Sequence, residues 1–219
     1  ETVWVCKETT ERPGYASPIA IEFGGVRQIV TMMEKSVVGV RADTGKLLWR
    51  VPHVAFADET VSTPLFRDGL VFVSTLFPGG GQCIALNSEG ETIAAKQAWQ
   101  SGALDNHHGG VVLLGDCLYG STTRGRWACL DFKTGKVMHV ADGVGKGSLT
   151  AADGMLYTYS EKGGTVGLVK ATPEAHRVVS QFRIPAGGQG PCWAHPVVCG
   201  GRLYLRHGEF LYCYDIQAK

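Results

Sequence analysis

The sequence predicts an all-β protein, and three observations indicate a β-propeller of four-stranded antiparallel blades. A short hairpin pattern recurs along the chain, its preceding turns are spaced 44, 47, 38 and 47 residues apart, and 30 of the 219 residues are glycine. About four short strands in every 40–45 residues is the usual content of a propeller blade. No apolar run follows the i, i+3, i+4, i+7 spacing of an amphipathic helix, so helical repeats are not expected.

The recurring hairpin is clearest at residues 40–52, which read VRADTGKLLWRVP. Two apolar runs flank Asp43–Lys46, and Gly45 can adopt the positive φ that a short hairpin loop with a bulge requires. Residues 129–140, CLDFKTGKVMHV, repeat this pattern, and residues 84–95, IALNSEGETIAA, are a shorter version. One hairpin alone would say little, but its recurrence indicates a repeat protein.

Each hairpin follows a turn rich in glycine or aspartate and, before it, a polar segment that leads into an apolar strand. These elements divide one predicted domain, residues 1–219, into blades at approximately 15–52, 61–100, 107–141, 146–185 and 193–219. We expect the first strands of these blades to begin near residues 16, 62, 109, 148 and 194. Residues 1–10, ETVWVCKETT, are interpreted as the outer strand of a preceding or closing blade.

The hairpin residues also carry a family resemblance. Gly39, Thr44, Gly45, Lys46 and Trp49 fit the pattern A-x-D-x-x-T-G-K-x-x-W, with Arg41 at the aspartate position, and the second copy has His139 at the tryptophan position. This resembles the tryptophan-docking pattern of the pyrroloquinoline-quinone (PQQ) like β-propeller family, which includes quinoprotein alcohol dehydrogenases and the outer-membrane assembly lipoprotein BamB.

The resemblance implies a ring of seven or eight blades, so we expect the chain to be part of a larger ring. The alternative is a five-bladed ring closed by residues 1–10. The large apolar face of Trp49 is expected to pack between adjacent blades.

Composition limits the possible functions. The formal charge of +1 gives no case for a nucleic-acid partner, and no apolar run approaches the length of a transmembrane segment. The seven cysteines form no C-x-x-C pair, so no metal site is expected, and the vicinal cysteine pair of several quinoprotein alcohol dehydrogenases is absent from the sequence. The resemblance implies a periplasmic or exported protein, although no signal peptide is visible.

The polar segments that lead into the innermost strands would meet at one mouth of the ring. The densest is LDNHHGG at 104–110, whose histidines could bind a metal, take a proton or contact an acidic quinone. The alternative is a polar loop whose histidines cap strand ends. No catalytic residue is assigned. The candidate residues for binding a cofactor or ligand at the mouth are Asn106, His107, His108, Lys146, Trp193 and His195.

Three functional classes remain open, and the sequence does not decide whether the protein is an enzyme. The favoured class is a non-catalytic module that binds a protein partner or a small ligand at the channel mouth. The alternative is a PQQ-dependent alcohol or sugar dehydrogenase, in which Ca²⁺ would need oxygen ligands such as Asp105 and Asn106. A carbohydrate-processing accessory domain is the third. The incomplete docking patterns favour the first class.

Overall fold

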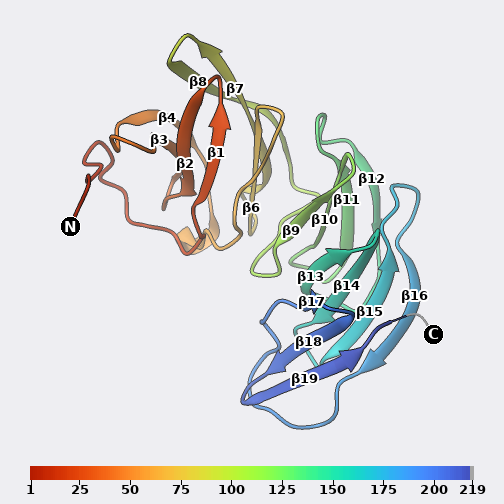
Figure 1. Cartoon of the computed structure of the whole chain (residues 1–219). Helices are drawn as coiled ribbons and strands as arrows, with labels where there is room; N and C mark the ends of the chain where they lie inside the picture. Colours follow the sequence, from red (N-terminus) through yellow and green to blue (C-terminus); the bar gives the residue numbers. More distant parts are fainter. Residues whose placement is uncertain (218–219) are drawn as a thin grey trace. The chain divides into compact units, whose positions relative to one another are not determined.

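The computed structural model describes residues 1–217, which fold into β-strands with a single 3₁₀ turn, η1 (Phe56–Asp58) (Figure 1). The strands form five antiparallel sheets, four with four strands and one with three. In every sheet the strands pair in their order along the chain, so each sheet is a simple meander. This confirms the predicted all-β fold with about five blade-like repeats.

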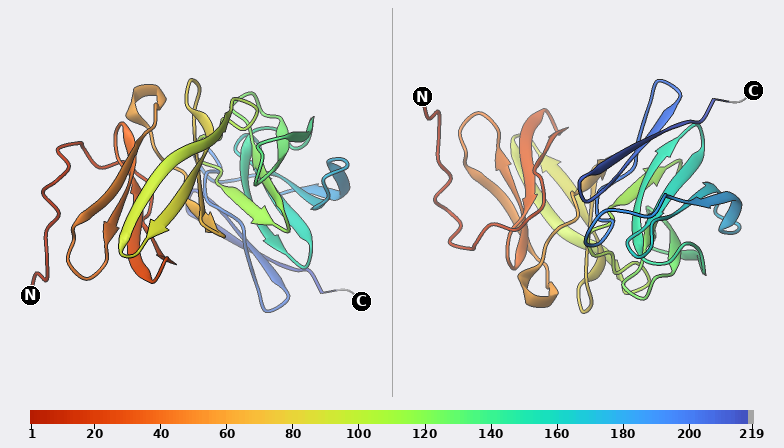
Figure 2. Two further views of the ribbon diagram at one scale, coloured as in Figure 1. Left: turned by 90° about the horizontal axis from the view of Figure 1, so that it is seen from above. Right: turned by 90° about the horizontal axis from the view of Figure 1, so that it is seen from below.

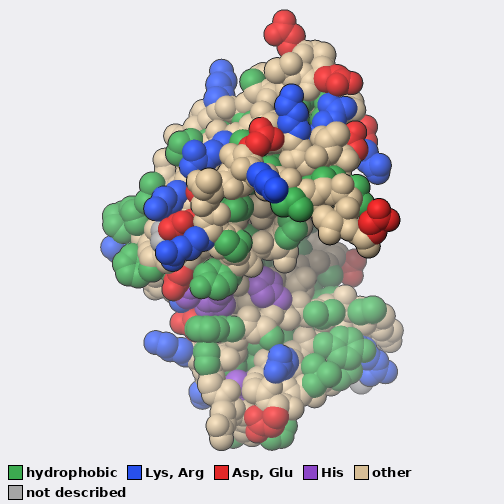
Figure 3. Space-filling model, turned by 90° about the vertical axis from the view of Figure 1, so that its left-hand side faces the viewer, with side chains coloured by type: hydrophobic (Ala, Val, Ile, Leu, Met, Phe, Trp, Pro, Cys, Tyr) green, Lys and Arg blue, Asp and Glu red, His purple; other side chains and the backbone are tan. Residues whose placement is uncertain are grey.

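The chain divides into two compact units, which are described separately. Unit 1 comprises residues 1–107 and 133–135, and unit 2 comprises residues 108–132 and the described residues from 136 onward. Charged side chains of both signs are interspersed over the face of the molecule seen in Figure 3. The described residues contain no helix with the length and hydropathy of a membrane span.

Unit 1 contains the first two sheets. The first consists of β1 (Ile19–Phe23), β2 (Val26–Met32), β3 (Ser36–Arg41) and β4 (Leu47–Pro52). The second consists of β5 (Leu65–Arg67), β6 (Leu70–Thr75), β7 (Gly80–Glu89) and β8 (Thr92–Ser101). The β7–β8 hairpin, yellow-green in Figure 2, has ten residues in each strand. The outer strands β4 and β8 contact each other.

Unit 2 contains the other three sheets. The third sheet consists of β9 (Val111–Leu114), β10 (Cys117–Ser121), β11 (Trp127–Asp131) and β12 (Val137–Ala141). The fourth sheet consists of β13 (Gly147–Ala152), β14 (Met155–Ser160), β15 (Thr165–Lys170) and β16 (Arg177–Arg183). The fifth sheet consists of β17 (Val197–Cys199), β18 (Arg202–His207) and β19 (Phe210–Asp215). The first strand β13 contacts the first strands β9 and β17 of the other sheets. First strands that neighbour one another are typical of blades around a propeller axis.

Three of the five first strands begin about three residues later than the sequence pattern predicts, and proline explains the difference. β1, β5 and β17 each begin at the residue after a proline, namely Pro18, Pro64 and Pro196, about three residues beyond the predicted starts. Proline has no N–H group to donate to the ladder, so regular pairing begins after it. The strands without such a proline, β9 and β13, begin at residues 111 and 147, within two residues of the prediction.

Trp49 lies between the two sheets of unit 1, as the docking pattern predicts. Its side chain is only 5% exposed and belongs to an apolar cluster that combines residues of both sheets. Its indole Nε1 donates a hydrogen bond to Oε1 of Gln28 at 2.7 Å. The ring lies directly against Gly39, where a Cβ atom would have no room. Packing between repeats is therefore confirmed as the role of Trp49.

The same contact recurs at two turn glycines of unit 1. The ring of Trp4 lies on Gly45, and its Nε1 donates to the carbonyl of Ala42 at 3.0 Å. The ring of Trp99 lies on Gly135 in the same way. Both glycines have positive φ, 72° and 71°, and neither site has space for a side chain. Residues 1–10 form no strand, and their assignment to the outer strand of another blade stays a prediction.

Two positions depart from the docking pattern. The sequence pattern missed Trp99 because the turn residue Gly90 precedes it by nine residues, whereas Gly45 precedes Trp49 by four. In unit 2, His139 stands at the tryptophan position, and its Nδ1 lies 3.2 Å from the carbonyl oxygen of Pro173. This histidine therefore contacts the turn that connects β15 to β16 in the following sheet.

Glu11 fastens the N-terminal segment to the first sheet. Its carboxylate accepts hydrogen bonds from the Lys35 N–H and the Ser36 hydroxyl, both at 2.9 Å, and forms an ion pair with Arg50. The side chain is 10% exposed. Burial alone would raise the pKa of Glu11, but these donors together lower the pKa below its ordinary value of 4.5.

We expect Glu11→Gln to lower the free energy of unfolding by about 1–3 kcal/mol at neutral pH, because the donors then meet a neutral amide with a single acceptor oxygen and Arg50 loses its ion pair. Since the folded state has the lower pKa, this contribution is complete above pH 4.5 and is lost as the pH falls through the folded value. Urea titrations at several pH values should therefore show the two proteins converging in acid. Glu22→Gln, at an exposed position, is the control; a difference independent of pH would contradict the prediction.

Candidate functional site

The six predicted site residues fall into two groups. Asn106 and His107 belong to unit 1, whereas His108, Lys146, Trp193 and His195 belong to unit 2. Each of the six side chains contacts residues of its own unit. The gathering of all six around one channel mouth stays a prediction.

In unit 1, Asn106 joins two parts of the fold. It is fully buried, its Oδ1 accepts a hydrogen bond from the Ser62 hydroxyl at 2.9 Å, and its backbone N–H donates to the Ser74 hydroxyl at 3.0 Å. The neighbouring His107 places Nε2 3.3 Å from the carboxylate of Glu59. The amide oxygen of Asn106 is thus used inside the protein, so this residue is poorly suited to bind a ligand or Ca²⁺.

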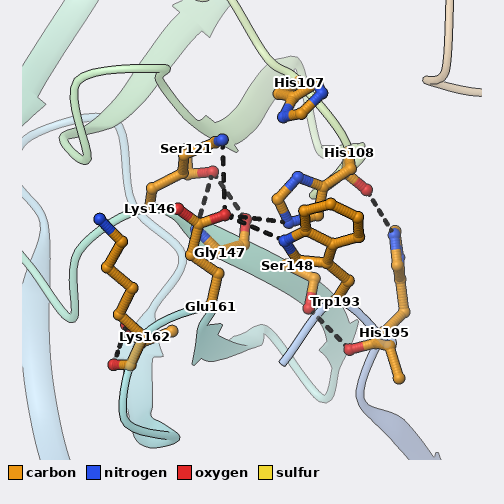
Figure 4. A network of polar contacts seen from close by, with 12 residues as sticks. His107, His108, Ser121, Lys146, Gly147, Ser148, Glu161, Lys162, Trp193 and His195 are labelled. Atoms are coloured by element: carbon orange, nitrogen blue, oxygen red, sulfur yellow. Dashed lines mark hydrogen bonds and ion pairs between the residues drawn. The ribbon is translucent and has the colours of Figure 1, made fainter. Parts of the chain in front are cut away.

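In unit 2, three of the four predicted residues converge on one carboxylate oxygen, Oε2 of Glu161 (Figure 4). The Trp193 indole donates a hydrogen bond to it at 3.1 Å, the Lys146 ammonium lies 3.4 Å away and Nε2 of His108 lies 3.6 Å away. The side chain of Glu161 is 13% exposed, and those of Lys146 and His108 are 19% and 8% exposed. These side chains form a mostly buried cluster, here called the Glu161 cluster.

Backbone hydrogen bonds hold the loops of the Glu161 cluster together. The N–H of Glu161 donates to the carbonyl of Lys146 at 2.9 Å, and the N–H of Cys192 donates to the carbonyl of Glu161 at 3.0 Å. The rings of His108 and Trp193 lie 4.9 Å apart between centroids. The cluster is therefore positioned by main-chain contacts as well as by its own charges.

His195 lies beside this cluster and contacts its backbone. The ring Nε2 lies 3.0 Å from the carbonyl oxygen of His108, and the ring packs against Gly110. The Ser148 hydroxyl donates to the carbonyl of Ala194 at 2.9 Å. These contacts join the segments that lead into β9, β13 and β17. His195 and Ser148 thus connect loops of neighbouring sheets in unit 2.

The sequence reasoning missed Glu161, the residue at the centre of the site. It considered only the segments that lead into first strands, whereas Glu161 lies in the turn between β14 and β15. In an antiparallel meander, the loop that enters the first strand and the turn between the second and third strands lie at the same end of the sheet. That rule would have placed the SEKGG turn, residues 160–164, beside Lys146.

Buried titratable groups outside the cluster serve packing. Burial raises the pKa of the Cys83 and Cys129 thiols to about 12, so both stay protonated and unreactive at neutral pH. Burial lowers the pKa of His53, whose ring nitrogens lie 2.7 and 2.8 Å from the side-chain oxygens of Gln82 and Thr75. No group of three or more potential metal ligands occurs among the described residues.

Comparison with known proteins gives a family match for the N-terminal repeats. Residues 1–94 match the family model described as outer membrane protein assembly factor BamB. No curated protein sequence gives a significant match.

Many solved structures share the fold, among them the following three. BamB from Moraxella catarrhalis is 15% identical with a TM-score of 0.63, covering 93% of this chain and 60% of the BamB chain. A europium-containing methanol dehydrogenase is 13% identical with a TM-score of 0.60, covering 94% of this chain and 50% of the dehydrogenase. The computationally designed Ika4 protein is 14% identical with a TM-score of 0.55, covering 78% of this chain and 99% of Ika4.

The chain thus spans 60% of the length of the BamB structure and half of the length of the dehydrogenase. The docking contacts of Trp49, Trp4 and Trp99 agree with the family match in the first two repeats. Residues 1–94 therefore resemble the repeats of the BamB family model, and the chain shares the β-propeller fold of BamB and of the methanol dehydrogenase.

Proposed function

We propose that this protein is a non-catalytic binding module that uses the loops around the Glu161 cluster to bind a protein partner or a small ligand. One observation carries the proposal. The cationic and N–H donors that a cofactor would need, on Lys146, Trp193 and His108, are already directed at the carboxylate of Glu161.

The residues present do not fit PQQ well. The quinone carries three carboxylates, which need several free cationic or N–H donors. A carboxylate of PQQ would have to compete with Glu161 for these donors, because Oε2 of Glu161 already interacts with Lys146, Trp193 and His108. Asn106 is fully buried and bonded to Ser62, so it does not supply an open oxygen for a metal ion.

The exposed side chain of Trp193 supports the binding role. Its indole is 52% exposed although its Nε1 is held by Glu161. A large aromatic surface with a fixed orientation loses little conformational entropy when a partner covers it, and tryptophan is enriched at the energetic centres of protein interfaces. The family description of BamB as an outer membrane protein assembly factor is compatible with a protein partner. A periplasmic or exported location is part of the same proposal.

The proposal is tested by titrating the protein with PQQ, with and without Ca²⁺, and following the intrinsic tryptophan fluorescence. We expect no saturable binding at micromolar PQQ, because the donors are occupied. Lys146→Ala and Trp193→Ala are examined in parallel. Saturable binding that Ca²⁺ strengthens and both variants weaken would contradict the binding-module proposal and favour the PQQ-dependent dehydrogenase.

A further inference from the structure

Unit 2 contains a pocket of about 450 Å³ whose wall includes Lys146 and Glu161 of the Glu161 cluster. Three turns line it, those that precede β11, β13 and β15. The lining includes three cations, Arg124, Lys146 and Lys162, and a single carboxylate, that of Glu161. The pocket therefore has two positive charges in excess.

Two of these cations have no anionic partner. Arg124 and Lys162 are exposed, and their side chains make no ion pair or hydrogen bond with the described residues. Nearby Arg126 differs, because its guanidinium pairs with Asp142 at 3.4 Å and donates to the carbonyl of Val140 at 2.8 Å. Arg124 and Lys162, which make no ion pair with the described residues, thus both line the pocket, whereas the paired Arg126 does not.

The carboxylate of Glu161 opposes an incoming anion less than its position suggests. Its Oε2 already interacts with Lys146, Trp193 and His108, so its charge is largely compensated. Part of the pocket wall is glycine main chain, from Gly125 and Gly145, which both have positive φ. A Cβ atom at Gly125 would lie 3.1 Å from the backbone nitrogen of Lys146, a tight contact, and the φ of 79° at Gly125 also favours glycine there.

We propose that this pocket binds a small molecule with two or more phosphate or carboxylate groups, held by Arg124 and Lys162. The planar guanidinium of Arg124 can bind an oxyanion through two N–H groups, and Lys162 can bind a second acidic group as a point charge. A volume of about 450 Å³ is within the range of small-molecule pockets. This inference deepens the proposed function and rests on it, because it names the class of small ligand that the loops around the Glu161 cluster would bind.

The test is isothermal titration calorimetry of the protein with pyrophosphate and with citrate as probes, at low ionic strength. We expect saturable binding of at least one probe, and the stronger probe identifies the preferred acidic group. Arg124→Ala and Lys162→Ala should each weaken binding by about tenfold or more, since each removes a charge-assisted contact. Both side chains are exposed, so thermal unfolding should be unchanged in the two variants.

Arg126→Ala is the matched control, because Arg126 lies two residues from Arg124 but does not line the pocket. It should change the affinity by less than about twofold. Failure of both probes to bind would overturn the inference. So would equal weakening by Arg126→Ala, which would indicate general surface attraction, or binding that Arg124→Ala and Lys162→Ala leave intact. Failure of both probes would leave the binding-module proposal standing, because that proposal rests on the Glu161 cluster and Trp193 and not on Arg124 and Lys162.

Discussion

Replacing Trp49 by alanine is expected to lower the free energy of unfolding by about 3–5 kcal/mol, as for other large-to-small changes in a core. The indole is 5% exposed and packs with residues from both sheets of unit 1, so its loss leaves a cavity where two repeats meet. The variant also removes the hydrogen bond to the fully buried Gln28, whose amide oxygen would then lose its indole partner.

Urea unfolding followed by circular dichroism measures this effect. Trp193→Ala is the matched control, because it removes the same side chain from a position that is 52% exposed; it should cost less than Trp49→Ala, about 1–2 kcal/mol, most of it from the lost hydrogen bond to Glu161. If Trp49→Ala unfolds at the same urea concentration as the unchanged protein, the packing between the two sheets does not depend on the docking tryptophan.

The fold could be predicted from the sequence because residues close together in the sequence specify each hairpin of the repeat. Turn glycines with positive φ and alternating apolar runs specify each hairpin locally, and the spacing of the repeats indicates the propeller. Strand starts were less accurate because Pro18, Pro64 and Pro196 delay the ladders. Trp99 was missed because its contact with Gly135 depends on tertiary structure, while the sequence pattern assumes a fixed distance from the turn.

The site could be predicted only in part. The residues that enter the first strands were recognised, and Lys146, Trp193 and His108 do meet in unit 2. The carboxylate that these three residues contact belongs to Glu161, which lies in a turn without a recognisable sequence motif. The free cations Arg124 and Lys162 likewise lie in turns between second and third strands. Their importance depends on which charges are paired in the folded chain, and a sequence does not show ion pairs between distant turns.

The Glu161 cluster leads to the last prediction. Glu161→Ala should lower the free energy of unfolding by about 2–4 kcal/mol, because it leaves the mostly buried ammonium of Lys146 and the indole N–H of Trp193 without their shared acceptor. Partial exposure of the Lys146 side chain, 19%, keeps the expected loss below that of a fully buried pair. Glu161→Gln should restore part of this stability, since an amide oxygen still accepts the indole N–H but carries no charge for Lys146.

Urea unfolding of both variants measures this loss of stability, with Lys162→Ala as the control from the same turn. Because Lys162 is exposed and makes no ion pair with the described residues, its removal should change the stability by less than about 0.5 kcal/mol. Removing the carboxylate also increases the positive charge around the pocket, so Glu161→Gln should bind pyrophosphate more tightly than the unchanged protein. Unchanged stability in Glu161→Ala would mean that water replaces the carboxylate without cost, and the cluster would then not organise the loops around it.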